Sequence, residues 1–205
     1  MLSRRASFIA SLVLAAAAPA CGAAAVRAVV TDASGHALAD AIVTLQPSAG
    51  RLPVRPMAEV QIAQHDLRFD PVLTVVTVGT PVLFPNRDTV RHHVYSFSST
   101  KTFQLKLYAG VPHKPVVFDK PGIAVLGCNI HDQMVAWVVV VDTPLWARSD
   151  AGGLAQVDGV APGSYQMRVW HATLAESTPP VVLPLLVAGA DVEQPVRLGR
   201  DGSAK

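Results

Sequence analysis

The chain has 205 residues, of which half are hydrophobic, and it carries 17 basic against 15 acidic side chains. This length allows one large or two small domains, and the hydrophobic share is sufficient for a packed core. Two of the basic residues, Arg4 and Arg5, lie in an N-terminal segment that has no acidic residue. Without this segment the chain has 15 basic and 15 acidic side chains. This balance excludes charge-driven binding to nucleic acid or to an anionic membrane.

Residues 1–25 have the features of an export signal peptide. Arg4 and Arg5 precede a short apolar stretch, Phe8–Leu14, and residues 18–20 form a small-x-small cleavage site, as do residues 23–25. The apolar stretch is shorter than a membrane span. We therefore expect a periplasmic protein with no membrane span after the signal peptide is removed. The alternative is an N-terminal anchor that is retained.

The two cysteines of the chain have different surroundings. Cys21 lies at the end of the expected signal peptide, where it is either a bystander or the attachment site of a lipid anchor. The leucine usual three positions before such a lipidated cysteine is replaced by Ala18. Cys128 therefore has no disulfide partner in the exported domain. An unpaired cysteine in an oxidising compartment calls for another role, and metal ligation is one.

The segments 26–55 and 142–205 show strand patterns that belong together. Val26–Pro47 has two apolar runs on either side of a turn-forming cluster at residues 32–35. This resembles the start of a carboxypeptidase regulatory-like (transthyretin-like) β-sandwich module, and the sequence from residue 149 onward resembles its continuation. The resemblance implies that the two flanks close into one small sandwich with the central segment inserted between them. The alternative is a single elongated β-domain.

The central segment, residues 56–141, consists of short apolar runs at regular spacing. Phe103–Leu107 alternates with period two, and Val135–Val141 is almost fully apolar, as is typical of a buried central strand. Seven or eight such strands predict an all-β, Greek-key sandwich. The expected strands are residues 60–62, 72–78, 81–84, 92–97, 103–107, 116–118, 123–126 and 135–141.

One loop combines three potential metal donors. Cys128, His131 and Met134 follow one another with two residues between each pair. Sulfur and imidazole ligands suit copper or zinc, and two histidines with one cysteine and a weak axial methionine form the blue-copper set. A buried apolar cysteine, a zinc site and a cysteine nucleophile with a histidine base are the alternatives. The positioned thioether favours copper over zinc, and no oxyanion loop or orienting acid supports the nucleophile.

The second imidazole has to come from His92 or His93, which begin another expected strand. Adjacent residues of a strand point to opposite faces, so only one of the two can face the core. Alternation leaves the choice open, because His93 shares its face with two aromatic side chains, Tyr95 and Phe97.

A further set of residues recurs in a fixed order through the central segment. They are Phe69, Pro71, Val76, Gly79, Val82, Phe84, Asn86 and Asp88, then His92, and then Phe118, Pro121, Gly122 and Cys128. With this order and the Cys-x-x-His-x-x-Met spacing, the chain from about residue 59 to residue 141 resembles the cupredoxins, the plastocyanin and amicyanin family. The resemblance implies one type 1 copper ion, with His92, Cys128 and His131 as trigonal ligands and Met134 as the axial ligand. It also places His93 where the family has an asparagine.

The resemblance implies a function as well. It indicates a periplasmic blue copper protein that is not an enzyme and that passes single electrons between redox partners, from a dehydrogenase donor to a c-type cytochrome or an oxidase. The ligand on the outer loop, His131, is the expected electron exit. The alternative is an envelope protein that binds or delivers copper, or a structural β-module without an electron-transfer role.

Residues around the expected ligands are assigned supporting roles. Asn86 and the backbone after Cys128 are expected to fix the ligand loops, and Gly127 is expected to allow close approach of a neighbouring strand. Arg87 and Asp88 are expected to form an ion pair within their loop. The remaining histidines are expected at the surface and the tryptophans in packing contacts; these are His36, His65, His113, His171, Trp137, Trp146 and Trp170.

Overall fold

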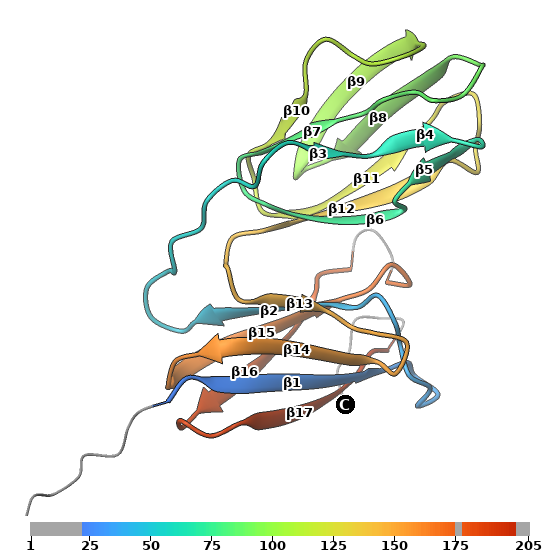
Figure 1. Cartoon of the computed structure of the whole chain (residues 1–205). Helices are drawn as coiled ribbons and strands as arrows, with labels where there is room; N and C mark the ends of the chain where they lie inside the picture. Colours follow the sequence, from blue (N-terminus) through green and yellow to red (C-terminus); the bar gives the residue numbers. More distant parts are fainter. Residues whose placement is uncertain (1–21, 175–177, 200–205) are drawn as a thin grey trace, which may run out of the picture.

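The computed structural model describes residues 22–174 and 178–199, and within these ranges every regular element is a β-strand. The strands form two sandwiches that lie one above the other (Figure 1). The described part of the chain contains no helix of the length and apolar character needed to cross a membrane. The expected signal peptide, apart from its last residues, and Cys21 lie outside the described residues.

The upper sandwich of Figure 1 is formed by one continuous segment. Its strands are β3 (Val60–Gln61), β4 (Ala63–His65), β5 (Arg68–Asp70), β6 (Leu73–Thr77), β7 (Thr80–Leu83), β8 (His92–Ser98), β9 (Lys101–Tyr108), β10 (Val116–Phe118), β11 (Gly122–Gly127) and β12 (Val135–Val141). A five-stranded sheet has the order β6-β12-β11-β8-β9, and a three-stranded sheet has the order β10-β7-β3. The β12–β6 and β3–β7 pairs are parallel, so the chain crosses between the two sheets as a Greek key requires.

The lower sandwich is assembled from both flanks of that segment. Its strands are β1 (Ala24–Thr31), β2 (Ile42–Pro47), β13 (Trp146–Arg148), β14 (Leu154–Val160), β15 (Gly163–Trp170), β16 (Val181–Val187) and β17 (Val192–Arg197). One sheet has the order β14-β1-β17 and the other β13-β2-β15-β16. The N-terminal strands β1 and β2 are therefore hydrogen-bonded to strands that follow the inserted sandwich, and the two flanks share one hydrophobic core.

The apolar character of β12 follows from its place between two cores. Ala136, Val138 and Val140 point into the upper sandwich, together with residues of both of its sheets. Val139 and Val141 point the other way, into a separate apolar cluster that joins the two sandwiches. A strand that is covered on both faces has no polar face, so the alternation expected of a half-buried strand is absent.

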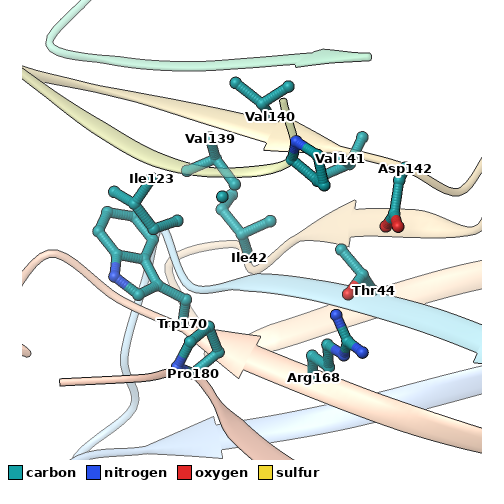
Figure 2. A pocket seen from close by; sticks show the side chains of 12 residues that line it. Ile42, Thr44, Ile123, Val139, Val140, Val141, Asp142, Arg168, Trp170 and Pro180 are labelled. Atoms are coloured by element: carbon teal, nitrogen blue, oxygen red, sulfur yellow. The ribbon is translucent and has the colours of Figure 1, made fainter. Parts of the chain in front are cut away.

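The contact between the sandwiches is apolar and centred on Trp170, the last residue of β15. Trp170 is 5% exposed and packs with Leu73 and Val139 of the upper sandwich and with Ile42 of the lower one. Figure 2 shows its indole ring beside Ile123, at the wall of a cavity of about 220 Å³ between the sandwiches. The expected packing role of this tryptophan is therefore observed, and it lies at the interface.

Candidate metal centre

The expected ligands lie at one end of the upper sandwich because of strand pairing. His92 is the first residue of β8, and Cys128 directly follows β11. These two strands are antiparallel neighbours that pair at Tyr95 and Gly127, so the start of β8 and the end of β11 lie at the same edge of the sheet. His131 and Met134 lie in the loop that leads from β11 to β12.

The structure brings three of the donor groups into direct proximity. The Nδ1 atoms of His92 and His131 are 3.2 Å apart, and the Cys128 Sγ atom is 3.8 Å from Nδ1 of His131. Nitrogen and sulfur atoms of these three residues all lie within 4.8 Å of one another. The two imidazole rings meet edge to face, with an interplanar angle of 62°. The two Nδ1 atoms thus face each other, and that of His131 also faces the sulfur.

Met134 closes the ligand loop from inside the core. Its side chain is 1% exposed and belongs to the same buried cluster as Cys128. Its backbone N–H donates a 2.9 Å hydrogen bond to the carbonyl of His131, which makes a tight turn of the intervening residues. The thioether is therefore held inside the sandwich, beneath the loop that carries the sulfur and the imidazole.

The structure places His92 rather than His93 at this cluster. His92 is fully buried, and the strand register shifts between His92 and Val94. His93 lies on the outer face of the sheet, where its ring packs against Tyr95 at a centroid distance of 5.6 Å. The aromatic face of β8, which ends in the exposed Phe97, is therefore the outer one.

Asp88 is a component of the site that the sequence interpretation misassigned. The expected ion pair between Arg87 and Asp88 is wrong, since the Asp88 carboxylate instead pairs with His92, with Oδ2 2.7 Å from Nε2. Burial alone would raise the pKa of Asp88, but hydrogen bonds from His92 and from the backbone N–H groups of Leu67 and Asp66 outweigh it and lower the pKa. An ionised Asp88 only accepts, so Nε2–H of His92 donates this hydrogen bond, and Nδ1 is the nitrogen that remains to bind a metal.

Asn86 holds the loop in front of His92. Its Nδ2 group donates to the carbonyls of Val90 and Tyr108 at 2.8 and 2.9 Å, and its Oδ1 atom accepts from the Asp88 backbone at 2.9 Å. The expected bracing role of Asn86 is therefore observed in these three bonds. They tie the loop that contains Asp88 to the end of β9.

A buried polar network below the site was not anticipated from the sequence. The Tyr108 hydroxyl donates to the Phe84 carbonyl at 2.6 Å and accepts from Gln64 Nε2 at 2.7 Å. Burial raises the pKa of Tyr108 to about 12, opposed by the Gln64 hydrogen bond and assisted by the nearby Cys128. Nothing in the local sequence marks Gln64 as a buried residue, because its neighbours His65 and Asp66 are polar and exposed.

Comparison with solved structures finds proteins of similar fold. A copper-containing nitrite reductase from Thermus scotoductus SA-01 aligns at 25% identity over 47% of this chain and 25% of its own, with a TM-score of 0.38. A purple cupredoxin from Nitrosopumilus maritimus aligns at 23% identity over 40% of this chain and 99% of its own, with a TM-score of 0.36. An amicyanin variant in its reduced Cu(I) form aligns at 17% identity over 48% of this chain and 99% of its own, with a TM-score of 0.37.

This chain thus spans a quarter of the nitrite reductase chain and nearly all of the two smaller proteins. Neither a protein-family model nor a curated protein sequence matches it. The similarity is one of fold. The expected fold class, an all-β chain with a Greek-key sandwich beside a second small sandwich, is confirmed by the strand order of the sheets.

Proposed function

We propose that this chain binds one copper ion as a type 1 centre and carries single electrons. His92, Cys128 and His131 serve as the three strong ligands, and Met134 serves as the weak axial ligand. The observation that supports this most directly is the cluster of two imidazole nitrogens and one sulfur: the Nδ1 atoms of His92 and His131 are 3.2 Å apart, and Cys128 Sγ lies 3.8 Å from Nδ1 of His131.

The donor atoms fit a shared metal ion. Nitrogen and sulfur ligands lie about 2.0–2.3 Å from a bound metal, so two donors to one ion lie no more than about 4.4 Å apart. Both measured separations satisfy this limit. A thiolate with two imidazoles suits copper or zinc, and the buried thioether of Met134 selects copper, because zinc gains nothing from a thioether.

The burial of the ligands supports electron transfer rather than metal delivery. His92, Cys128 and Met134 are 0%, 4% and 1% exposed, and all three are packed within the sandwich. Bound copper supplies a one-electron couple between Cu(I) and Cu(II). The packed side chains keep one arrangement for both states, which keeps the reorganisation on electron transfer small. A protein that hands copper to an acceptor needs ligands that the acceptor can reach.

The electron exit is proposed to be His131, the least buried of the four ligands. Three exposed apolar side chains lie on the loops at this end of the sandwich: Val90, Val111 and Ile130. The loop that contains Val90 is tied to the loop that contains Val111 by a backbone hydrogen bond, in which the N–H of Asn86 donates to the carbonyl of Gly110. We infer that redox partners dock here, a dehydrogenase as donor and a c-type cytochrome or an oxidase as acceptor, and that the chain is a carrier and not an enzyme.

Export to the periplasm is part of the proposal and is supported by residues 1–25 alone. The first described strand begins at Ala24, so cleavage after residue 20 leaves β1 intact. The mass of the mature protein tests this. A chain that begins near residue 21 supports export with processing, and additional mass on Cys21 identifies a lipid anchor. A periplasmic fraction that lacks the protein contradicts export.

The lower sandwich is proposed to be a carboxypeptidase regulatory-like module. Two of its turns have the same hydrogen bonds. Asp32 accepts from the backbone two and four residues later, and Asp150 does the same. These side-chain turns support the resemblance seen in the sequence. We propose that this module serves as a structural support for the copper-binding sandwich.

Spectra of copper-loaded protein test the proposed function. We expect an intense visible thiolate-to-copper band, a type 1 EPR signal and reversible one-electron reduction. A matched pair of variants tests the ligand assignment. His92→Gln should abolish the band, and His93→Gln should retain it, because only His92 faces Cys128. A colourless and redox-inactive copper complex would contradict the proposal, as would loss of copper to an acceptor in one oxidation state.

A further inference from the structure

We propose that Asp88 is a positioning residue that lowers the reduction potential of the copper centre, and that the turn between β4 and β5 exists to hold its carboxylate in place. This inference rests on the proposed function. It assigns a role to a hairpin that contributes no metal donor.

The Asp88 carboxylate is fixed from three sides. Its Oδ2 atom lies 2.7 Å from His92 Nε2. The backbone N–H of Asp66 donates to Oδ1 at 2.8 Å, and the backbone N–H of Leu67 donates to Oδ2 at 3.1 Å. Both carboxylate oxygens are therefore occupied, and the side chain is only 13% exposed. With Asn86 bonded to its backbone, Asp88 has one available orientation.

The turn that holds the carboxylate has an unusual backbone. Asp66 and Leu67 have φ angles of 53° and 57°, in the left-handed region, which aspartate tolerates but leucine disfavours. The backbone N–H groups of both residues point toward Asp88, and successive N–H groups of a turn form an anion-binding concavity of this kind. The two hydrogen bonds to Asp88 offset the backbone strain. Leu67 is 40% exposed, so its amide rather than its side chain is what the site uses.

A fixed carboxylate on the second nitrogen of a metal-bound histidine has two effects. It holds the tautomer in which Nδ1 faces the metal, and it makes the imidazole a stronger donor. It also adds a negative charge close to the metal, on a side chain that is 13% exposed and only partly screened by water. With Cys128 and Asp88 both anionic, the buried cluster is neutral around Cu(II) and has a net negative charge around Cu(I). Asp88 therefore favours the oxidised state.

The copper-loaded full chain with Asp88→Asn tests this. The substitution removes the charge and keeps the size of the side chain. We expect the visible band to remain and the midpoint potential to rise, with at least a tenfold shift toward the reduced form at a given applied potential, which is about 59 mV for one electron. The matched control is Asp132→Asn, which removes an exposed carboxylate from the ligand loop itself. We expect it to shift the potential much less.

A measurement without copper keeps the inference testable if the variant binds the metal poorly. In the metal-free protein we expect the His92 side chain to carry its proton on Nε2, with slow exchange of that proton in nitrogen-15 NMR spectra, and to lose this protection in Asp88→Asn. Equal potential shifts in the two variants, or a proton on Nδ1 of His92, would overturn the inference. Absence of a blue centre in the unmodified chain would instead contradict the proposed function and leave the NMR result to decide the role of Asp88.

Discussion

The ring of Tyr95 lies directly against the backbone of Gly127. The two residues pair across β8 and β11, and a Cβ atom at position 127 would lie 2.7 Å from both Cζ and the hydroxyl oxygen of Tyr95. This is closer than real Cβ contacts approach. Because Gly127 immediately precedes Cys128, the contact fixes the end of β11 beside the sulfur. The close approach expected for this glycine is therefore made by an aromatic ring.

Gly127→Ala is expected to destabilise the protein by overpacking. The added methyl group must displace the Tyr95 ring or the strand, and an extra group in a packed region lowers the free energy of unfolding by about 1–3 kcal/mol. Urea unfolding of the metal-free protein measures the loss. In the copper-loaded form, any movement of the strand is transmitted to Cys128, and we expect a shift of the visible band.

A double-mutant comparison separates the ring contact from other roles of this glycine. If the clash is the cause, Gly127→Ala should lose much less stability when Tyr95→Leu is also present, because the shorter side chain leaves room for the methyl group. An equal loss in both backgrounds would show that the ring is not responsible.

Trp170→Ala is expected to weaken the interface between the sandwiches and to leave the metal site unchanged. Removal of a buried tryptophan lowers the free energy of unfolding by about 3–5 kcal/mol. The contacts of Trp170 lie on the face of β12 opposite to the core that contains Cys128 and Met134. We therefore expect a lower unfolding midpoint, with separate transitions for the two sandwiches, and an unaltered copper spectrum. Calorimetry and absorption spectra measure the two effects.

The control for Trp170 is another tryptophan of the same cluster. Trp146 is only partly buried there, so Trp146→Ala should have a clearly smaller effect on the unfolding midpoint. Equal losses for both substitutions, or loss of the visible band in Trp170→Ala, would contradict the assigned interface.

The parts of this protein that were predictable from sequence are those set by local spacing. Cys128, His131 and Met134 share one short loop, so their proximity follows from the chain itself. Alternation could not separate His92 from His93, because the more aromatic face of the strand, that of His93, is the outer one and not the core face. Which of the two histidines lies at the metal cluster depends on which face of β8 packs against the second sheet, and this is a property of the tertiary structure.

The parts that were missed depend on contacts between distant residues. The turn at Asp66 and Leu67 lacks the glycine or asparagine that usually marks a tight hairpin, so β4 and β5 were not expected as separate strands. The turn is stabilised by Asp88, 21 and 22 residues further along. The expected ion pair between Asp88 and Arg87 was wrong for the same reason. Sequence neighbours suggest local pairs, whereas the position of the Asp88 carboxylate depends on a turn far away in the sequence.

His171 is expected to make the protein less stable in mild acid. Burial lowers its pKa below the usual 6.5, against smaller opposing effects of the Ala39 carbonyl and Asp40. Above about pH 6.5 both the folded and the unfolded chain hold a neutral ring, and the full stability is present. As the pH falls below this value, the unfolded chain binds the proton first, so stability is lost.

His171→Gln is expected to remove this component of the stability loss in acid. Urea unfolding at about pH 7.5 and about pH 5.5 should show a smaller decrease for the variant than for the unmodified protein. The exposed His113 serves as control, and His113→Gln should leave the decrease unchanged. A decrease in His171→Gln as large as in the unmodified protein would contradict the assigned role.

Tyr108 is expected to dominate the response to alkaline pH. Its pKa of about 12 lies well above the usual value for tyrosine, mainly because of burial. The folded protein therefore keeps the proton where the unfolded chain releases it, so stability is complete below about pH 10 and declines as the pH rises toward 12.

Tyr108→Phe should be less stable than the unmodified protein at neutral pH by about 1–3 kcal/mol, because Gln64 loses a buried partner. The difference should shrink above about pH 10. Tyrosinate absorbance checks the assignment: one of the three tyrosines should ionise late, and this late step should be absent in Tyr108→Phe.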